Sequence, residues 1–153
     1  MTINGIICPI KIIREENEIG MSIASLRREI NSINGQISRY RVKIVEYEAT
    51  KVKIETAKQK LSNVTENLQL AYENLTINYQ SEEGKKKGNS ILLISGIVSD
   101  VIDSMINTIN YLDSQVSAIK RQIERSENKI ASLRRQIKKL QDDLNVSGSA
   151  RYD

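Results

Sequence analysis

Two ladders of apolar residues restrict what this chain can fold into. In the first, apolar side chains recur at alternating steps of three and four residues: Ile23, Leu26, Ile30, Ile33, Ile37, Tyr40, Ile44 and Tyr47. This spacing is the a/d seam of a coiled-coil helix, because it returns apolar side chains to one narrow stripe. After Lys51 the ladder resumes at Ile54, Ala57, Leu61, Val64, Leu68, Ala71 and Leu75. Two successive three-residue steps near Ile54 predict a stammer, which overwinds the supercoil locally.

The second ladder is more regular than the first. Its first seam position is held by Ile91, Val98, Met105, Leu112, Ile119, Ser126, Leu133 and Leu140. Its other seam position is held by Ile102, Ile109, Val116, Ile123, Ile130, Ile137 and Leu144. Only Ser126 and the first turn interrupt the apolar pattern, so this ladder predicts a second long coiled-coil helix.

The two ladders cover residues 22–78 and 90–145, and the short segment "NYQSEEGKKKGNS" joins them. Each ladder corresponds to roughly 80 Å of helix at a rise of 1.5 Å per residue. Equal lengths and a short link predict an all-α fold, a long antiparallel two-helix coiled-coil hairpin over 22–145 with a turn at about 79–90. In that turn we expect Gly84 to end the first helix and Asn89 or Ser90 to cap the second.

The glycines and lysines of the link do not form a phosphate-binding loop. That motif requires a strand, then G-x-x-x-x-G-K-[ST], whereas here Asn89 follows the second glycine and no strand is expected before it. The lysines are therefore expected to be solvated.

Composition argues against an enzyme. The 153-residue chain has no histidine and only one cysteine, Cys8, so the usual general base, an internal disulfide and a cysteine-rich metal site are all missing. The sequence offers no nucleophile–base pair, and we expect neither catalysis nor a cofactor or metal. The net charge of +4 is spread among acids, and it does not indicate nucleic acid. Asp100 and Asp103 interrupt the most apolar run, so we expect no membrane span.

The two ends of the chain lie outside the ladders. Residues 1–20 are expected to be an irregular extension, because Pro9 disfavours continuous helix. Met21, followed by Ser22 as a helix cap, is a candidate for the natural start of the protein. Residues 146–153 are expected to form a flexible tail.

The second helix carries more apolar residues than a two-helix seam needs. Five of them fall beside the seam: Leu93, Ile94, Ile97, Val101 and Ile106. A wide apolar face is typical of a helix in a larger bundle, so we predict that these residues bind another chain. The alternative is that they pack on the N-terminal segment "INGIICPIKII" of the same chain.

The segments "MSIASLRREINSINGQISRYRVKIVEYEATKVKIETAKQKL" and "YLDSQVSAIKRQIERSENKIASLRRQIKKLQDDL" resemble the YwqH-like family. These are small helical proteins of Gram-positive bacteria, encoded beside LXG toxins of the type VII (ESX) secretion system and similar to WXG helical hairpins. The resemblance implies a non-enzymatic accessory protein, an adaptor or targeting chaperone that binds the helical N-terminal domain of an LXG-type toxin. A second small helical accessory protein is a further implied partner.

The same resemblance implies a cytoplasmic protein that is a monomer or dimer alone, with co-secretion as an open alternative. The chain departs from the WXG pattern because it has no tryptophan. Two other functions remain open from the sequence. One is a self-associating structural coiled coil, and the other is a prefoldin-like chaperone subunit, although the short link leaves no room for the β-hairpins that prefoldins carry between their helices.

Overall fold

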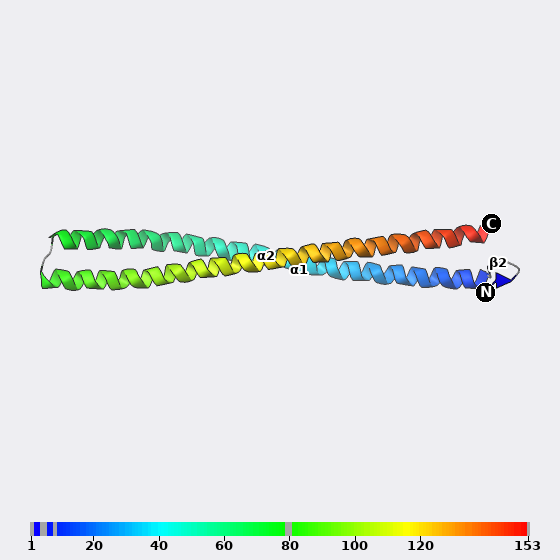
Figure 1. Cartoon of the computed structure of the whole chain (residues 1–153), viewed down its shortest axis with the longest axis horizontal. Coiled ribbons are helices and arrows are strands. Elements are labelled where there is room, and N and C mark those ends of the chain that lie inside the picture. The colour runs from blue at the N-terminus through cyan, green and yellow to red at the C-terminus, as the bar shows by residue number, and fades with distance from the viewer. Residues whose placement is uncertain (1, 4–5, 8, 79–80, 153) are drawn as a thin grey trace. The chain divides into compact units, whose positions relative to one another are not determined.

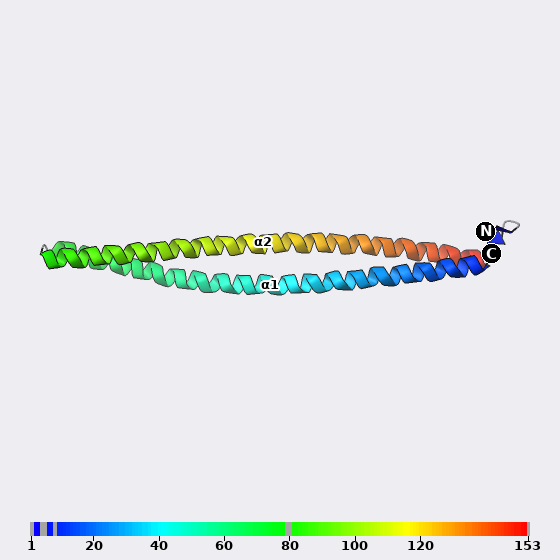
Figure 2. The same cartoon turned by 90° about the horizontal axis from the view of Figure 1, so that it is seen from below.

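The computed structural model describes residues 2–3, 6–7, 9–78 and 81–152, and almost all of them are helical. A short antiparallel pair, β1 (Thr2–Ile3) and β2 (Ile6–Ile7), precedes the helices α1 (Pro9–Asn78) and α2 (Glu82–Tyr152) (Figure 1). The two helices pack together as an antiparallel coiled-coil hairpin, which confirms the predicted fold class (Figure 2).

Both helices are longer than their ladders, with 70 and 71 residues. Helix α1 begins at Pro9, so the predicted irregular extension is helical from residue 9 onward and Ser22 lies inside the helix. Proline is tolerated in the first turn of a helix, where its missing N–H would have no partner. At the other end α2 continues to Tyr152, so the prediction of a flexible tail over 146–153 is wrong for residues 146–152.

The turn is shorter than predicted, because α2 already begins at Glu82. Ser81 caps this helix: its Oγ accepts a hydrogen bond from the Gly84 N–H at 3.1 Å, and its carbonyl accepts one from the Lys85 N–H at 3.0 Å. Serine at the N-cap satisfies a backbone donor that the helix itself leaves free. The helix start is therefore set by Ser81, and residues 79–80 of the predicted turn lie outside the described residues.

Three expectations about the turn are corrected by this helix start. Gly84 belongs to the first turn of α2 rather than to the end of α1, and Asn89 and Ser90 lie within α2. Gly84 and Gly88 are both buried, and they continue the second ladder backward from Ile91 in steps of three and four. A Cβ on Gly88 would lie 3.4 Å from the Tyr72 ring. The Tyr72 ring of α1 therefore packs against Gly88 of α2.

The chain forms two compact units. Unit 1 comprises residues 1–42 and 120–153, and unit 2 comprises residues 43–119. The core of unit 1 consists of seam residues from both helices: Ile23, Ile30, Ile33, Ile37, Ile130, Leu133 and Ile137. All seven were predicted from the ladders, and the seam of unit 1 is confirmed.

In unit 2 the α1 seam differs from the prediction. From residue 51 onward a regular three–four alternation runs through the half-buried residues Lys51, Ile54, Lys58, Leu61, Thr65, Leu68, Tyr72 and Leu75, and the half-buried Ala57 and Ser62 flank this seam. Val64 and Ala71 are exposed instead, so the predicted stammer is wrong. The α2 ladder is regular, and α1 keeps in register with it even though this places Lys58 and Thr65 on the seam.

Lys51 shows how the seam accommodates a charge. Its Nζ lies 2.9 Å from Oδ1 of Asp113 on α2. The hydrogen bond to Asp113 raises the pKa of Lys51 above the usual 10.5, so Lys51 is charged at neutral pH, and its contribution to the pair is lost as the pH rises through this raised pKa. A polar residue at a seam position specifies register at a cost in stability.

We expect Lys58→Ile to raise the melting temperature by about 2–4 °C, because an apolar side chain replaces a charge on a half-buried seam. Lys51→Ile should give a smaller gain, since it also removes the bond to Asp113. Circular dichroism melting of the two variants beside the unaltered chain measures both effects. A lower melting temperature for Lys58→Ile would contradict the seam register in unit 2.

Candidate partner-binding face

The heptad positions of unit 2 follow from its buried seam. Position a is held on α1 by Lys51, Lys58, Thr65 and Tyr72, and on α2 by Gly88, Ser95, Ile102 and Ile109. Position d is the other seam position. Position g is the residue immediately before a, and position e is the residue immediately after d. In coiled coils e and g flank the seam and usually carry charged residues that pair between the helices.

Unit 1 follows this rule. At its g positions Lys129 of α2 forms an ion pair with Glu29 of α1, with 2.6 Å between Nζ and Oε1. At its e positions Arg41 pairs with Glu127 at 3.1 Å. Both sides of the seam in unit 1 are therefore bordered by charge.

Unit 2 breaks the rule on the g side. The g positions in the middle of unit 2 hold Ala57, Val64 and Ala71 on α1, and Ile94 and Val101 on α2, whereas those nearer its ends are polar or charged, as at Lys43, Thr50, Lys87 and Thr108. The approach of the Tyr72 ring to Gly88 sets the register, because these two a positions face each other. One heptad away, Val64 then lies at the level of Ile94, and a further heptad away Ala57 lies at the level of Val101. Apolar residues thus occupy the places where unit 1 has an ion pair.

Two more apolar residues widen this surface on α2. Ile97 falls at position c, next to g around the helix, and Leu93 falls at position f, next to c. We call the six residues Ala57, Val64, Leu93, Ile94, Ile97 and Val101 the apolar face. Leu93 is 69% exposed, Ile97 57% and Val64 41%. Ala57 is half-buried and the other five residues are exposed. Exposed apolar surface of this kind marks interaction sites.

Four of the five predicted binding residues, Leu93, Ile94, Ile97 and Val101, come together on the apolar face. The fifth, Ile106, is exposed but falls at an e position, on the far side of the seam. Ile106 directly follows the seam residue Met105, whereas Ile94 and Val101 directly precede seam positions, so Ile106 lies on the opposite flank. Val64 was missed, because the predicted stammer put it in the core.

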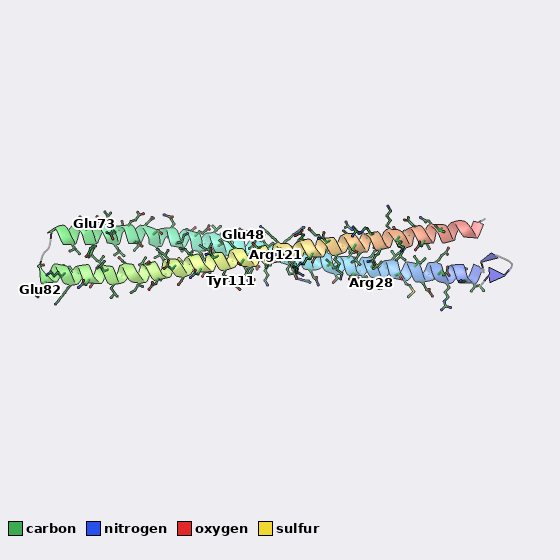
Figure 3. All side chains as sticks on the ribbon, viewed as in Figure 1. Arg28, Glu48, Glu73, Glu82, Tyr111 and Arg121 are labelled. Atoms are coloured by element: carbon green, nitrogen blue, oxygen red, sulfur yellow. The ribbon has the colours of Figure 1, made fainter. Side chains whose placement is uncertain are left out.

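Charged residues border the apolar face. On α2, Lys86 and Asp100 stand seven residues before and seven residues after Leu93, at the same heptad position. Asp103 falls at position b, next to that column. Further along α2 the c column reaches Tyr111, which is 61% exposed and is labelled in Figure 3. Glu82 and Glu83 also lie at the lysine end, where Glu83 pairs with Lys87 at 3.6 Å, so the α2 surface runs from a mixed, net basic end to an acidic end across its apolar centre.

The described part of the chain offers little support for a metal site or a catalytic site. No group of three His, Cys, Asp or Glu residues there could hold a metal ion. An open groove of about 440 Å³ in unit 1 is bordered by Asn34, Ser38 and Ala131, with the Arg41–Glu127 ion pair beside it. These residues do not provide a nucleophile with a neighbouring base.

The hydropathy of α2 bears on the expected absence of a membrane span. Within Glu82–Val146 one 18-residue window has a mean hydropathy of 1.5 and no more than two charged residues, and none of it is buried in the structure. By length and composition this helix meets the requirement for crossing a membrane, so the expectation is not confirmed.

Comparisons with known proteins address the fold. No protein-family model matches this chain, and no curated protein matches it either. Among solved structures, a coiled-coil segment of Smc from Pyrococcus yayanosii is similar, with a TM-score of 0.66 and 18% sequence identity. The alignment covers 92% of this chain and 64% of that segment, so the chain spans less than two thirds of its neighbour. At this identity the likeness shows the coiled-coil fold alone.

Proposed function

We propose that this protein is a non-enzymatic adaptor that binds an amphipathic helix of a partner protein on the apolar face of unit 2. The observation that carries the proposal is the change at the g positions, from the Glu29–Lys129 ion pair in unit 1 to Val64 and Ile94 in unit 2. A third helix packed there would convert the two-helix seam into a bundle, and a bundle helix buries a wider apolar face.

The distribution of buried apolar residues supports the same proposal. Unit 1 buries its large aliphatic residues in one cluster, whereas unit 2 has no buried seam residue among the described residues of α1. Unit 2 also holds most of the exposed large apolar residues, including Leu93 and Ile97. In this division of roles unit 1 holds the hairpin together and unit 2 provides the binding surface.

The resemblance to the YwqH-like family suggests the partner. We propose that it is the helical N-terminal domain of an LXG-type toxin, which the adaptor would present for type VII secretion in a Gram-positive cell. A long amphipathic helix is the kind of ligand that an apolar strip bordered by polar residues accepts, with anchors spaced like Leu93, Ile97 and Val101.

The test is co-expression with the N-terminal domain of the toxin encoded next to this gene, followed by pull-down. Ile97→Asp should abolish capture, because it buries an unpaired charge in an apolar interface. The matched control is Val42→Asp, since Val42 is 59% exposed in unit 1 and Ile97 is 57% exposed in unit 2. Both variants should keep their helicity. Equal capture by Ile97→Asp and the unaltered chain would remove the apolar face as the binding site.

A structural coiled coil is the second candidate, and the likeness to the Smc coiled-coil segment favours it. A structural protein of this kind would form extended polymers alone, whereas an adaptor stays small. Light scattering of the purified chain separates the two functions.

A further inference from the structure

The apolar face also affects how the free protein behaves when no partner is bound. Before a partner is bound, Leu93, Ile97 and Val64 would stand in water, and together they form one contiguous surface across both helices. Exposed surface of this kind favours association. The charges on α2 indicate which molecule covers it in the absence of a partner.

We propose that two copies of this chain pair through the apolar face, with the α2 helices antiparallel about a two-fold axis. In such an interface each copy presents the same patch, and a contact from residue i to residue j occurs twice. The apolar side chains set the register, because Leu93 of one copy can pack on Ile97 of the other and Ile97 on Leu93. The axis then passes at the level of Ser95.

This register brings opposite charges together. Lys86 lies seven residues before Leu93, and Asp103 lies six residues after Ile97. When Leu93 faces Ile97 across the axis, Lys86 of one copy lies almost level with Asp103 of the other. The offset is one residue, about 1.5 Å along the helix. Asp100 is about 6 Å away along the same edge. Both ends of the interface therefore pair a lysine with aspartates.

A parallel arrangement reverses this outcome. In register, it would gather the lysines of both copies at one end and Asp100 and Asp103 of both copies at the other, so no lysine would lie level with an aspartate, and like charges gathered at each end oppose association. The charged residues also share one flank of the apolar face, with Lys86 and Asp100 at position f and Asp103 at position b. An antiparallel two-fold axis places this flank of one copy beside the same flank of the other. Charge complementarity thus selects the antiparallel pair.

The dimer rests on the same surface as the proposed function and adds regulation to it. Two copies that cover each other's apolar faces would stay soluble until a partner helix competes for the surface. Partner binding and self-association would then be mutually exclusive, and one partner domain would separate the two copies.

The experiment is a charge exchange monitored by sedimentation equilibrium. The unaltered chain should sediment as a dimer of the 17.3 kDa protomer. Lys86→Glu alone and Asp103→Lys alone should each weaken the dimer about tenfold or more, because each variant sets like charges opposite each other at both ends. An equimolar mixture of the two variants should recover the dimer as a heterodimer. Lys138→Glu, an exposed change in unit 1, is the control and should leave the dimer unchanged.

Several outcomes would overturn the dimer. The first is that the unaltered chain is a monomer at about 100 µM. The second is that the mixture of Lys86→Glu and Asp103→Lys fails to restore association. The third is that the chain is a monomer and floats with phosphatidylcholine vesicles. Circular dichroism confirms that each variant is folded. If the chain is monomeric while Ile97→Asp still abolishes capture of the toxin domain, the dimer is wrong and the adaptor function stands. If the charge exchange behaves as expected and no toxin domain is captured, the adaptor function fails and the dimer stands.

Discussion

Ile130→Ala is expected to destabilise the hairpin by about 2–5 kcal/mol, the cost of removing a large aliphatic side chain from a packed core. Ile130 is 6% exposed and belongs to the cluster that includes Ile30, Ile37 and Leu133. That cluster is the main core of unit 1, so no other apolar cluster nearby compensates for the removed side chain. The melting temperature should fall by about 5–15 °C. Chemical unfolding followed by circular dichroism measures the free energy directly.

The control for this experiment is Leu93→Ala. Leu93 is 69% exposed, so its truncation in the free protein should change the free energy of unfolding by no more than about 0.5 kcal/mol. The measurement is made at low concentration, where self-association does not contribute. Equal losses for the two variants would mean that the core of unit 1 has been assigned to the wrong residues.

Val64→Glu combined with Ile94→Lys should weaken partner binding by about 100-fold or more. The change copies the Glu29–Lys129 pair of unit 1 into the equivalent g positions of unit 2. It removes apolar area from the centre of the face and requires two charges to be desolvated when a helix docks. The hairpin itself should keep its stability, because the two new charges can pair in water as Glu29 and Lys129 do. Isothermal titration with the toxin's N-terminal domain measures the affinity.

The matched control places the same two residues on the other side of the seam. Ser62→Glu combined with Ile106→Lys introduces them at e positions, one on each helix. Binding should be retained, because the partner is expected on the g side alone. Loss of binding in both double variants, with helicity intact, would show that the g side is not the specific site.

Much of the fold could be predicted from the spacing of apolar residues. The second ladder from Ile91 to Leu144 is regular, and the structure uses it as its seam throughout. The seam of unit 1 could be predicted equally well. Its residues Ile30, Ile33 and Ile37 pack with Ile130 and Ile137, and few other apolar residues nearby offer an alternative seam. A repeating 3.5-residue period determines which face of a helix is buried, and that information is local in the sequence.

Where the α1 pattern becomes ambiguous, only the packing of α1 against α2 decided the outcome. Between Ile54 and Leu75 the sequence offers two stripes, one through Val64 and Ala71 and one through Lys58, Thr65 and Tyr72. The first is more apolar, yet the second is buried, because it keeps α1 in phase with α2 and places Tyr72 over Gly88.

The helix ends were likewise decided by particular contacts. Ser81 starts α2 through its bond to the Gly84 N–H, and Pro9 starts α1. The sequence by itself therefore determined the hairpin, the seam of unit 1 and the exposure of four residues of the apolar face. The tertiary structure decided the register of unit 2, and with it the exposure of Val64 beside Ile94, because register depends on both helices at once.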